Sequence, residues 1–178
     1  MSIAANVFSE AAENQALMKT TIKSLLLLLL FVSPSLADRS TPDGAVNEFY
    51  QWYQQSSFEY RKKFTEAAPY FTEELYGLLR DGFGQSPESD FWVDFDPFVN
   101  AQMDAQAISV GKPSSKGPGV AVVPVTPTYG RGGASNYEGD PIKVWVKQVG
   151  GEWKIANLVY TGDFPFELKK YLKEGLGR

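Results

Sequence analysis

The periodicity of the sequence changes at one stretch, Asp94-Phe95-Asp96-Pro97-Phe98-Val99-Asn100-Ala101-Gln102-Met103-Asp104. Before it, apolar residues recur at the spacing of amphipathic helices. After it, they alternate with a period of two, which is typical of strands. The stretch itself concentrates acids, aromatic residues, amides and a proline. We therefore expect it to join a helical half to a strand-rich half, and we expect any ligand site to lie near it.

The residues before this junction predict three helices. Thr41-Pro42-Asp43 has the hydroxyl, the early proline and the acid that are typical of a helix start. A short helix is expected over residues 57–64 and another over residues 71–79, ended by Gly82. Residues 81–89 are rich in glycine and serine and predict a loop. The first helix should present one apolar face, made by Val46, Phe49, Tyr50 and Tyr53.

The residues after the junction predict four strands and a last helix. The strands are expected over residues 105–110, 119–128, 141–149 and 152–161, and the helix over residues 163–175. Gly150-Gly151 between the last two strands is a strong hairpin signal. Pro124 implies that the second strand is an edge strand or contains a bulge. Residues 129–133 predict a flexible hairpin loop.

The hairpin turn also predicts which side chains share a face of the sheet. If Val149 pairs with Glu152, alternation defines a core face, made by Ile142, Val144, Val146, Trp153, Ile155 and Val159. The opposite, outer face then carries lysines together with Trp145, Leu158 and Tyr160. This register places the amide of Asn157 among apolar side chains, where it needs hydrogen-bond partners.

Helices followed by an antiparallel sheet predict an α+β fold. We expect the N-terminal helices to pack on one face of a curved, antiparallel, four-stranded sheet, followed by a C-terminal helix. A cone with a pocket between helices and sheet is the natural form of this arrangement. Residues 38–178 have the length of one domain.

Composition excludes several chemistries. The chain contains no histidine and no cysteine, so Ser-His and Cys-His catalysis, disulfides and the usual zinc ligands are ruled out. Its formal net charge is −4 without a basic stripe, so we expect no nucleic-acid partner. The oxygen-rich junction departs from the calcium-loop pattern, because Val99 stands at the glycine position. We expect no metal and no cofactor.

The N-terminus predicts an export signal. Lys19 and Lys23 precede an apolar run at residues 25–32, and Ser35-Leu36-Ala37 supplies the small residues of a cleavage site. We predict a signal peptide at residues 18–37 that is cut after Ala37, leaving a periplasmic or secreted protein without a membrane span. Residues 1–17 are then a spurious extension ahead of Met18. The alternative for the apolar run is a short membrane anchor or a buried helix.

Four segments of the chain together resemble a known family. They are residues 46–53, Phe71-Thr72-x-Glu74-Leu75, Asp94-x-Asp96-Pro97-Phe98 with Ala101-Gln102, and Trp153-Lys154-Ile155-Ala156-Asn157. They are similar to the bacterial domain of unknown function 3828 family, of the nuclear transport factor 2-like superfamily. The resemblance implies a cystatin-like cone in an envelope protein. Members resemble secreted proteins or lipoproteins, and this chain lacks the cysteine of the lipoprotein form.

The candidate site centres on two acids of the junction. Asp94 and Asp96 are two residues apart, so in an extended segment both could enter one pocket. The alternative is that both cap a turn begun by Asp96-Pro97. The predicted pocket residues are Tyr50, Tyr53, Trp92, Asp94, Asp96 and Asn157. The predicted interface residues are Trp145, Leu158 and Tyr160, unless the C-terminal helix covers them.

Three functions fit these features. The first is an exported, non-enzymatic binding or protein-interaction domain of the bacterial envelope, whose partner is a small molecule, an envelope protein or a second copy in a homodimer. The second is a small-molecule isomerase or hydrolase with Asp94 or Asp96 as base, because a carboxylate in an apolar pocket can be tuned upward. The third is a structural envelope component without a pocket. Fold alone does not choose between them.

Overall fold

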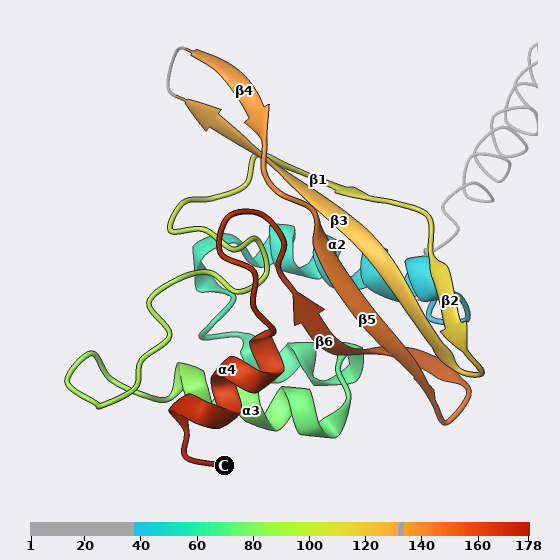
Figure 1. The fold of residues 1–178 in the computed structure, drawn as a ribbon, viewed down its shortest axis with the longest axis horizontal. Helices are drawn as coiled ribbons and strands as arrows, with labels where there is room; N and C mark the ends of the chain where they lie inside the picture. Colours follow the sequence, from blue (N-terminus) through green and yellow to red (C-terminus); the bar gives the residue numbers. More distant parts are fainter. Residues whose placement is uncertain (1–37, 132–133) are drawn as a thin grey trace, which may run out of the picture. The chain divides into compact units, whose positions relative to one another are not determined.

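The computed structural model describes residues 38–131 and 134–178. The predicted signal peptide and the predicted N-terminal extension lie outside these residues. The described residues belong to one compact unit, Ala37–Arg178, drawn in colour in Figure 1. Among them, no helix combines the length and the apolarity that crossing a membrane requires.

The helical half of this unit has the first and the last of the three predicted helices, whereas the predicted helix at residues 57–64 is replaced by two 3-10 helices. Helix α2 spans Pro42–Ser56, the 3-10 helices η1 and η2 span Ser57–Glu59 and Phe64–Tyr70, and α3 spans Glu73–Phe83. The hydroxyl of Thr41 accepts a hydrogen bond from the backbone N–H of Gly44 at 3.1 Å, as expected of a residue that caps a helix start. Two acids stand in the first turn of α3 and Arg80 in its last turn, which suits the helix dipole.

The second half forms one antiparallel sheet of six strands, not the four that we predicted. The strands are β1 (Ala107–Val110), β2 (Ser114–Gly117), β3 (Val120–Arg131), β4 (Ala134–Glu138), β5 (Ile142–Val149) and β6 (Glu152–Val159). Their order is β1-β3-β5-β6, and β2 and β4 also pair with β3. Prediction missed β2 and β4 because both are short and polar, and they form strands by pairing with the long β3.

Strand β3 explains the proline that seemed out of place in a strand. Pro124 lies within β3, which has neighbours on both sides, so the prediction of an edge strand was wrong. The strand beside it is interrupted opposite the proline: β1 ends at Val110 and β2 begins at Ser114. Since proline has no N–H to donate, a gap in the neighbouring strand accommodates it.

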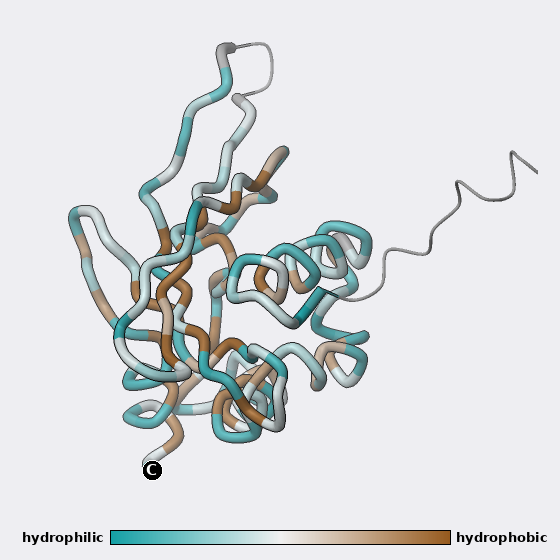
Figure 2. The backbone as a smooth tube through the Cα atoms, turned by 90° about the vertical axis from the view of Figure 1, so that its right-hand side faces the viewer, coloured by the Kyte–Doolittle hydropathy of each residue, from teal (hydrophilic) through white to brown (hydrophobic). Residues whose placement is uncertain are grey.

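The β3–β4 hairpin extends beyond the rest of the sheet. Figure 1 shows it reaching away from the helices, and Figure 2 shows that it is mostly hydrophilic. Its pairing is Thr128 with Glu138 and Tyr129 with Tyr137. The predicted loop at residues 129–133 is therefore partly strand.

The core lies between helix α2 and one face of the sheet. Figure 2 shows hydrophobic segments gathered between these layers. Phe49 from α2 and Phe71, at the start of the chain segment that leads into α3, are both almost fully buried. Phe71 forms a single parallel bridge with Ile155 of β6, so the helical half is joined to the edge of the sheet by backbone as well as by side chains.

Helix α4 closes the unit against α3 and β6. It spans Leu168–Gly175, so it begins five residues later than the predicted helix at 163. Its buried leucines, Leu168 and Leu172, face the core. Lys169 and Lys173 bind Glu74 of α3 at 3.0 and 2.6 Å, and these two cations lower the pKa of Glu74 to about 2.

A single bulge in β6 decides which side chains of the hairpin face outward. Val149 pairs with Glu152 and Val146 with Ile155, as predicted, but the register shifts at Ala156. Beyond the shift, Leu158 pairs with Val144 and Asn157 with Trp145. Because side chains alternate between faces, one extra residue moves the following residues to the opposite face.

The bulge corrects three of the predicted positions. Leu158 and Tyr160 belong to the core, where each is 1% exposed, and not to an outer interface patch. Asn157 lies on the outer face beside Trp145, and not among the apolar residues of the core face. Val159 pairs with Lys143 and so also lies on the outer face.

Candidate functional site

The junction stretch contains a tight turn from Asp96 to Ala101. The backbone N–H of Asp96 donates to the carbonyl of Ala101 at 2.7 Å, and the N–H of Ala101 donates back at 3.4 Å. The Oδ1 atom of Asp96 accepts a hydrogen bond from the N–H of Phe98 at 2.8 Å. Asn100 has φ of 54°, a left-handed conformation that asparagine tolerates better than most residues. Asp96 therefore shapes the turn through its side chain.

Four tyrosines bind this turn: two from α2, one from β3 and one directly after β6. Tyr160 donates to the carbonyl of Pro97 at 2.7 Å and Tyr50 to that of Phe98 at 2.8 Å. Tyr129 of β3 donates to the carbonyl of Val99. Tyr53 donates to the Oδ2 atom of Asp96 at 2.8 Å. These phenols satisfy polar groups that are buried with the turn, as buried polar groups require.

The chain just before the turn is held by Arg61, which sequence inspection did not single out. Its guanidinium donates to the carbonyl of Val93 at 2.9 Å and to that of Phe95 at 2.7 Å. The same group lies 4.9 Å from the centre of the Phe83 ring, a cation–π distance. The planar fork of arginine suits two carbonyls at once, and only the three-dimensional structure brings them together.

Phe98 fills the space between the helices and the sheet. Its side chain is fully buried, and its ring centre lies between 4.9 and 6.3 Å from six other rings. The pocket that we predicted between helices and sheet coincides with this packed aromatic cluster. Tyr50 and Tyr53, which we predicted as pocket residues, are part of the same core.

The electrostatics of Asp96 follow from its burial. Desolvation raises the pKa of its carboxyl, and the hydrogen bonds from Phe98 and Tyr53 oppose that effect. The same burial, together with the nearby carboxylate, raises the pKa of Tyr53 and of Tyr50. A small pocket of ≈240 Å³ includes Tyr53 in its lining, together with Gln54, Asp104, Ala105 and Gln106. Asp96 does not line it.

Asp94 and Asp96 do not form a carboxylate pair. Asp94 is exposed, whereas Asp96 is partly buried in the turn. The charge of Asp94 acts instead on Tyr171 of α4, whose pKa is raised first by burial and then by this carboxylate. The structure therefore separates the two acids that the sequence suggested as a pair.

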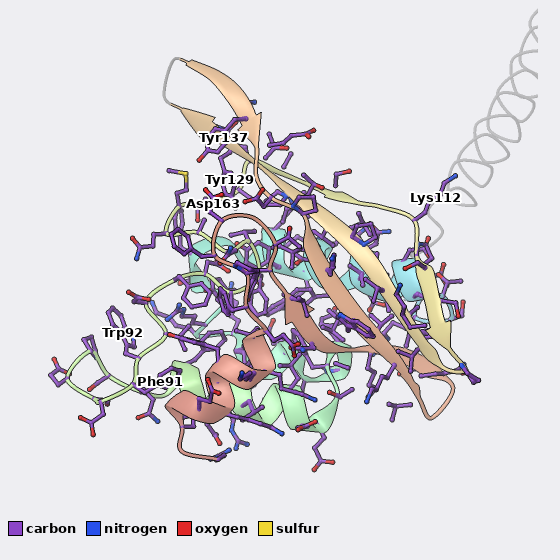
Figure 3. The ribbon with its side chains drawn as sticks, in the orientation of Figure 1. Phe91, Trp92, Lys112, Tyr129, Tyr137 and Asp163 are labelled. Atoms are coloured by element: carbon purple, nitrogen blue, oxygen red, sulfur yellow. The ribbon has the colours of Figure 1, made fainter. Side chains whose placement is uncertain are left out.

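Trp92 lies in the loop that connects α3 to the turn. It is 41% exposed, and Figure 3 shows it beside Phe91 on the half of the loop that returns to the body of the unit. Phe91 packs against Tyr171, with ring centres 5.3 Å apart. Trp92 therefore belongs to the surface, away from Tyr50 and Asp96.

Asn157 has a structural partner at the start of α4. Its Oδ1 atom accepts a hydrogen bond from the backbone N–H of Lys169 at 3.0 Å. Its Nδ2 atom donates to Glu167 at 3.2 Å. The first N–H groups of a helix lack partners within the helix, so this amide fixes α4 beside the outer face of β6.

A groove runs along the outer face of β5 and β6 beside the start of α4. Its volume is ≈480 Å³, and it is lined by Val120, Lys143, Trp145, Lys147, Ala156, Asn157, Val159, Glu167 and Lys169. We call this feature the Trp145 groove. Two predicted site residues, Trp145 and Asn157, meet here through the cross-strand pair that the bulge creates.

The lysines of the Trp145 groove differ in how they are neutralised. Lys169 binds Glu74 at 3.0 Å. Within residues 38–131 and 134–178, neither Lys143 nor Lys147 forms an ion pair. Lys147 also stands directly opposite Lys154 on β6, and like charges in this arrangement are unfavourable.

A second, larger pocket lies on the other side of α4. Its volume is ≈570 Å³, and its lining is Val159, Tyr160, Pro165, Phe166, Glu167, Lys170, Tyr171 and Glu174. One ion pair lies here, between Lys170 and Glu174 at 3.8 Å. Its aromatic rings pack against one another, and the ring centres of Phe166 and Tyr160 are 4.3 Å apart. These rings therefore fill space between α4 and the sheet.

The part of the chain that the structure describes contains no cluster of three or more acidic or other ligating side chains that could hold a metal ion.

Comparison of the chain with models of protein families, with curated proteins and with solved structures found no match in any of the three.

Proposed function

We propose that residues 38–178 form an exported, non-enzymatic binding domain of the bacterial cell envelope, with its ligand site in the Trp145 groove. We place it with the domain of unknown function 3828 family and the cone-shaped fold of the nuclear transport factor 2-like superfamily. Its α+β order, with helices on one face of an antiparallel sheet, supports that placement. The site proposal moves the binding surface from the core face of the sheet to the outer face.

The pairing of Lys147 with Lys154 carries the proposal. The chain has a formal net charge of −4, so acids are available to neutralise lysines, and Lys169 is neutralised in this way. Lys147 and Lys154 instead face each other across two strands. Mutual repulsion between them costs free energy in the unliganded protein. A bound anion removes that cost, which favours a binding role over a purely structural one.

The chemistry of the Trp145 groove indicates the kind of ligand. Trp145 is half-buried and lies between Lys143 and Lys147 on the same strand face. An indole offers a flat apolar surface for stacking, and lysine offers a mobile point charge that suits carboxylate, sulfonate or phosphate groups. We therefore infer a ligand that carries an anionic group on a flat, apolar ring.

The alternative of an acid–base enzyme has less support. Both carboxylate oxygens of Asp96 accept hydrogen bonds, from Phe98 and from Tyr53. A general base must reach the proton that it removes, and Phe98 fills the space where the substrate would lie. The Trp145 groove lies on the opposite face of the sheet from this acid.

Fluorescence titration with anilinonaphthalene sulfonate tests the proposal. This probe has an anionic group on flat rings, and N-phenylnaphthylamine is its uncharged counterpart. We expect Lys143→Gln combined with Lys147→Gln to weaken sulfonate binding roughly tenfold, equivalent to about 1.4 kcal/mol, and to leave the uncharged probe unaffected. Trp145→Leu should weaken both probes, because it removes the stacking surface.

The matched control changes two lysines outside the Trp145 groove. Lys112 and Lys116 are exposed and form no ion pair among the described residues, and Figure 3 shows Lys112 at the edge of the sheet that carries β1 and β2. Lys112→Gln with Lys116→Gln makes the same change in net charge and should leave both affinities unchanged. Equal weakening by the two double variants would show that the probe responds only to net charge, and would refute this site.

A further inference from the structure

The loop between α3 and the turn has the charge and the exposed ring that complement the Trp145 groove. It runs over residues 84–94 and carries Glu88, Asp90 and Asp94, all exposed. None of the three forms an ion pair within the described residues. The exposed indole of Trp92 lies between the last two acids. We call this segment the acidic loop.

The acidic loop cannot be explained as a cover for its own groove. In Figure 1 it projects on the side of the unit away from the β5–β6 hairpin turn. The end of the loop that leads into the turn is held in place, because Phe91 packs on Tyr171 of α4 and Arg61 binds the carbonyl of Val93. The groove and the loop of one chain therefore lie on different sides of the unit. One molecule thus carries acids without a basic partner beside an exposed ring, and lysines without an acidic partner beside another ring.

We propose that the acidic loop of one copy of this chain occupies the Trp145 groove of a second copy. Glu88 and Asp90 would meet Lys143, Lys147 and Lys154, and Trp92 would lie against Trp145. The two contacting surfaces are different parts of the molecule, so the association is head-to-tail and forms chains or closed rings. This inference rests on the proposed groove, and it makes self-association compete with ligand binding.

Salt dependence follows from the charges. Lys143, Lys147 and the acids of the loop are solvent-exposed before they meet. Their attraction is screened over about 10 Å at 0.1 M salt and about 3 Å at 1 M. We expect association to weaken when salt is raised, whereas contact through the apolar core of a protein interface does not respond in this way.

Sedimentation velocity of the full chain, over about a hundredfold range of concentration, measures the association. We expect the weight-average mass to rise with concentration for the wild type. Lys143→Glu with Lys147→Glu should abolish the rise, because an acidic groove repels an acidic loop. Glu88→Lys with Asp90→Lys should abolish it equally, because a basic loop then meets a basic groove.

Mixing the two charge-reversed proteins is the decisive step. Neither variant can associate with itself. In the mixture, the acidic groove of the first variant is complementary to the basic loop of the second, and the unchanged acidic loop of the first is complementary to the unchanged basic groove of the second. We expect the equimolar mixture to associate as the wild type does. Asp104→Lys with Asp163→Lys is the control, since both acids are exposed and lie outside the acidic loop; this variant should associate like the wild type.

Two results would overturn the inference: a wild-type chain that stays monomeric at every concentration, or a mixture that remains monomeric when the wild type associates. The fluorescence titration at low protein concentration is a separate measurement. If the sulfonate probe binds the Trp145 groove while the chain stays monomeric, the proposed function stands and self-association fails. If the charge-swapped mixture associates but the probe does not bind, self-association stands and the proposed ligand binding fails.

Discussion

The turn Asp96–Ala101 and the Trp145 groove both combine aromatic rings with polar groups, yet they treat those groups in opposite ways. In the turn, Asp96 and three carbonyls each have a donor, supplied by tyrosines and by backbone. In the groove, Lys143 and Lys147 have no acid partner among the described residues. Buried polar groups that are all satisfied indicate architecture. The unpaired lysines beside Trp145 form the surface that we propose a second molecule completes.

The largest expected effect tests whether the turn is part of the core. Phe98→Ala should lower the free energy of unfolding by about 3–5 kcal/mol, as for other fully buried phenylalanines, because six rings surround this side chain. Urea unfolding measures it. Phe58→Ala is the control: this ring is 80% exposed, and its loss should change stability by less than about 0.5 kcal/mol. If both variants lost the same unfolding free energy, the turn would not be part of the core.

A smaller effect tests the tyrosine hydrogen bonds. Tyr160→Phe removes the donor to the carbonyl of Pro97 and leaves that buried acceptor without a partner, which costs about 1–3 kcal/mol. The same urea experiment applies. Tyr76→Phe removes a phenol that packs beside Phe64 and makes no hydrogen bond to this turn, so stability should hardly change. If Tyr160→Phe were equally mild, the turn would not depend on its phenols.

The next prediction concerns pH. Burial raises the folded-state pKa of Asp96 above its ordinary value of 3.8, so the folded protein binds this proton more tightly than the unfolded chain does. The contribution to stability is then full below 3.8 and is lost as pH rises through the folded pKa. Asp96→Asn cannot titrate, and the urea-derived stability of this variant should lack that decline.

The comparison protein for this pH series is Asp94→Asn, which changes an exposed acid two residues away. It should keep the decline seen in the wild type. A decline of the same size in Asp96→Asn would assign the pH dependence to another group, and the turn would then be insensitive to the charge of Asp96.

The smallest effect tests the groove. Lys154→Glu turns the like-charge pair with Lys147 into an opposite-charge pair and should raise the free energy of unfolding by about 0.2–1 kcal/mol. It should also weaken binding of anilinonaphthalene sulfonate, because Lys147 then has a partner within the protein. Lys116→Glu makes the same change in charge on β2 and should do neither. A destabilised Lys154→Glu would argue against repulsion in the wild type.

The register of the β5–β6 hairpin shows how far sequence inspection reaches. The Gly150-Gly151 turn and the pairing of Val146 with Ile155 were predicted and are present. The prediction then failed for Leu158 and Tyr160, which are buried. The local sequence around Ala156 contains no pattern that predicts a bulge. It is favoured because it brings Leu158 and Tyr160 into the core and lets Asn157 hold the start of α4.

The candidate site was harder to predict than the fold. Trp145, Asn157 and the lysines of β5 were visible in the sequence, but they share a groove only because the bulge pairs Trp145 with Asn157. Arg61 gave no signal at all, since its two acceptors lie more than thirty residues away in the chain. The two missed strands are short and polar, so they lack the apolar alternation that predicts a strand, even though each pairs with the adjacent β3 through a short connection.

The sequence by itself determined the α+β order, the position of the junction at residues 94–104 and the absence of histidine and cysteine chemistry. These follow from composition and from short-range periodicity, which are local properties. The tertiary structure alone decided that the junction is a tyrosine-bound turn, and that Asn157 lies beside Trp145 on the outer face while Leu158 and Tyr160 are buried. Both depend on contacts between residues distant in the chain, and on one extra residue in β6 that reverses which face each following side chain occupies.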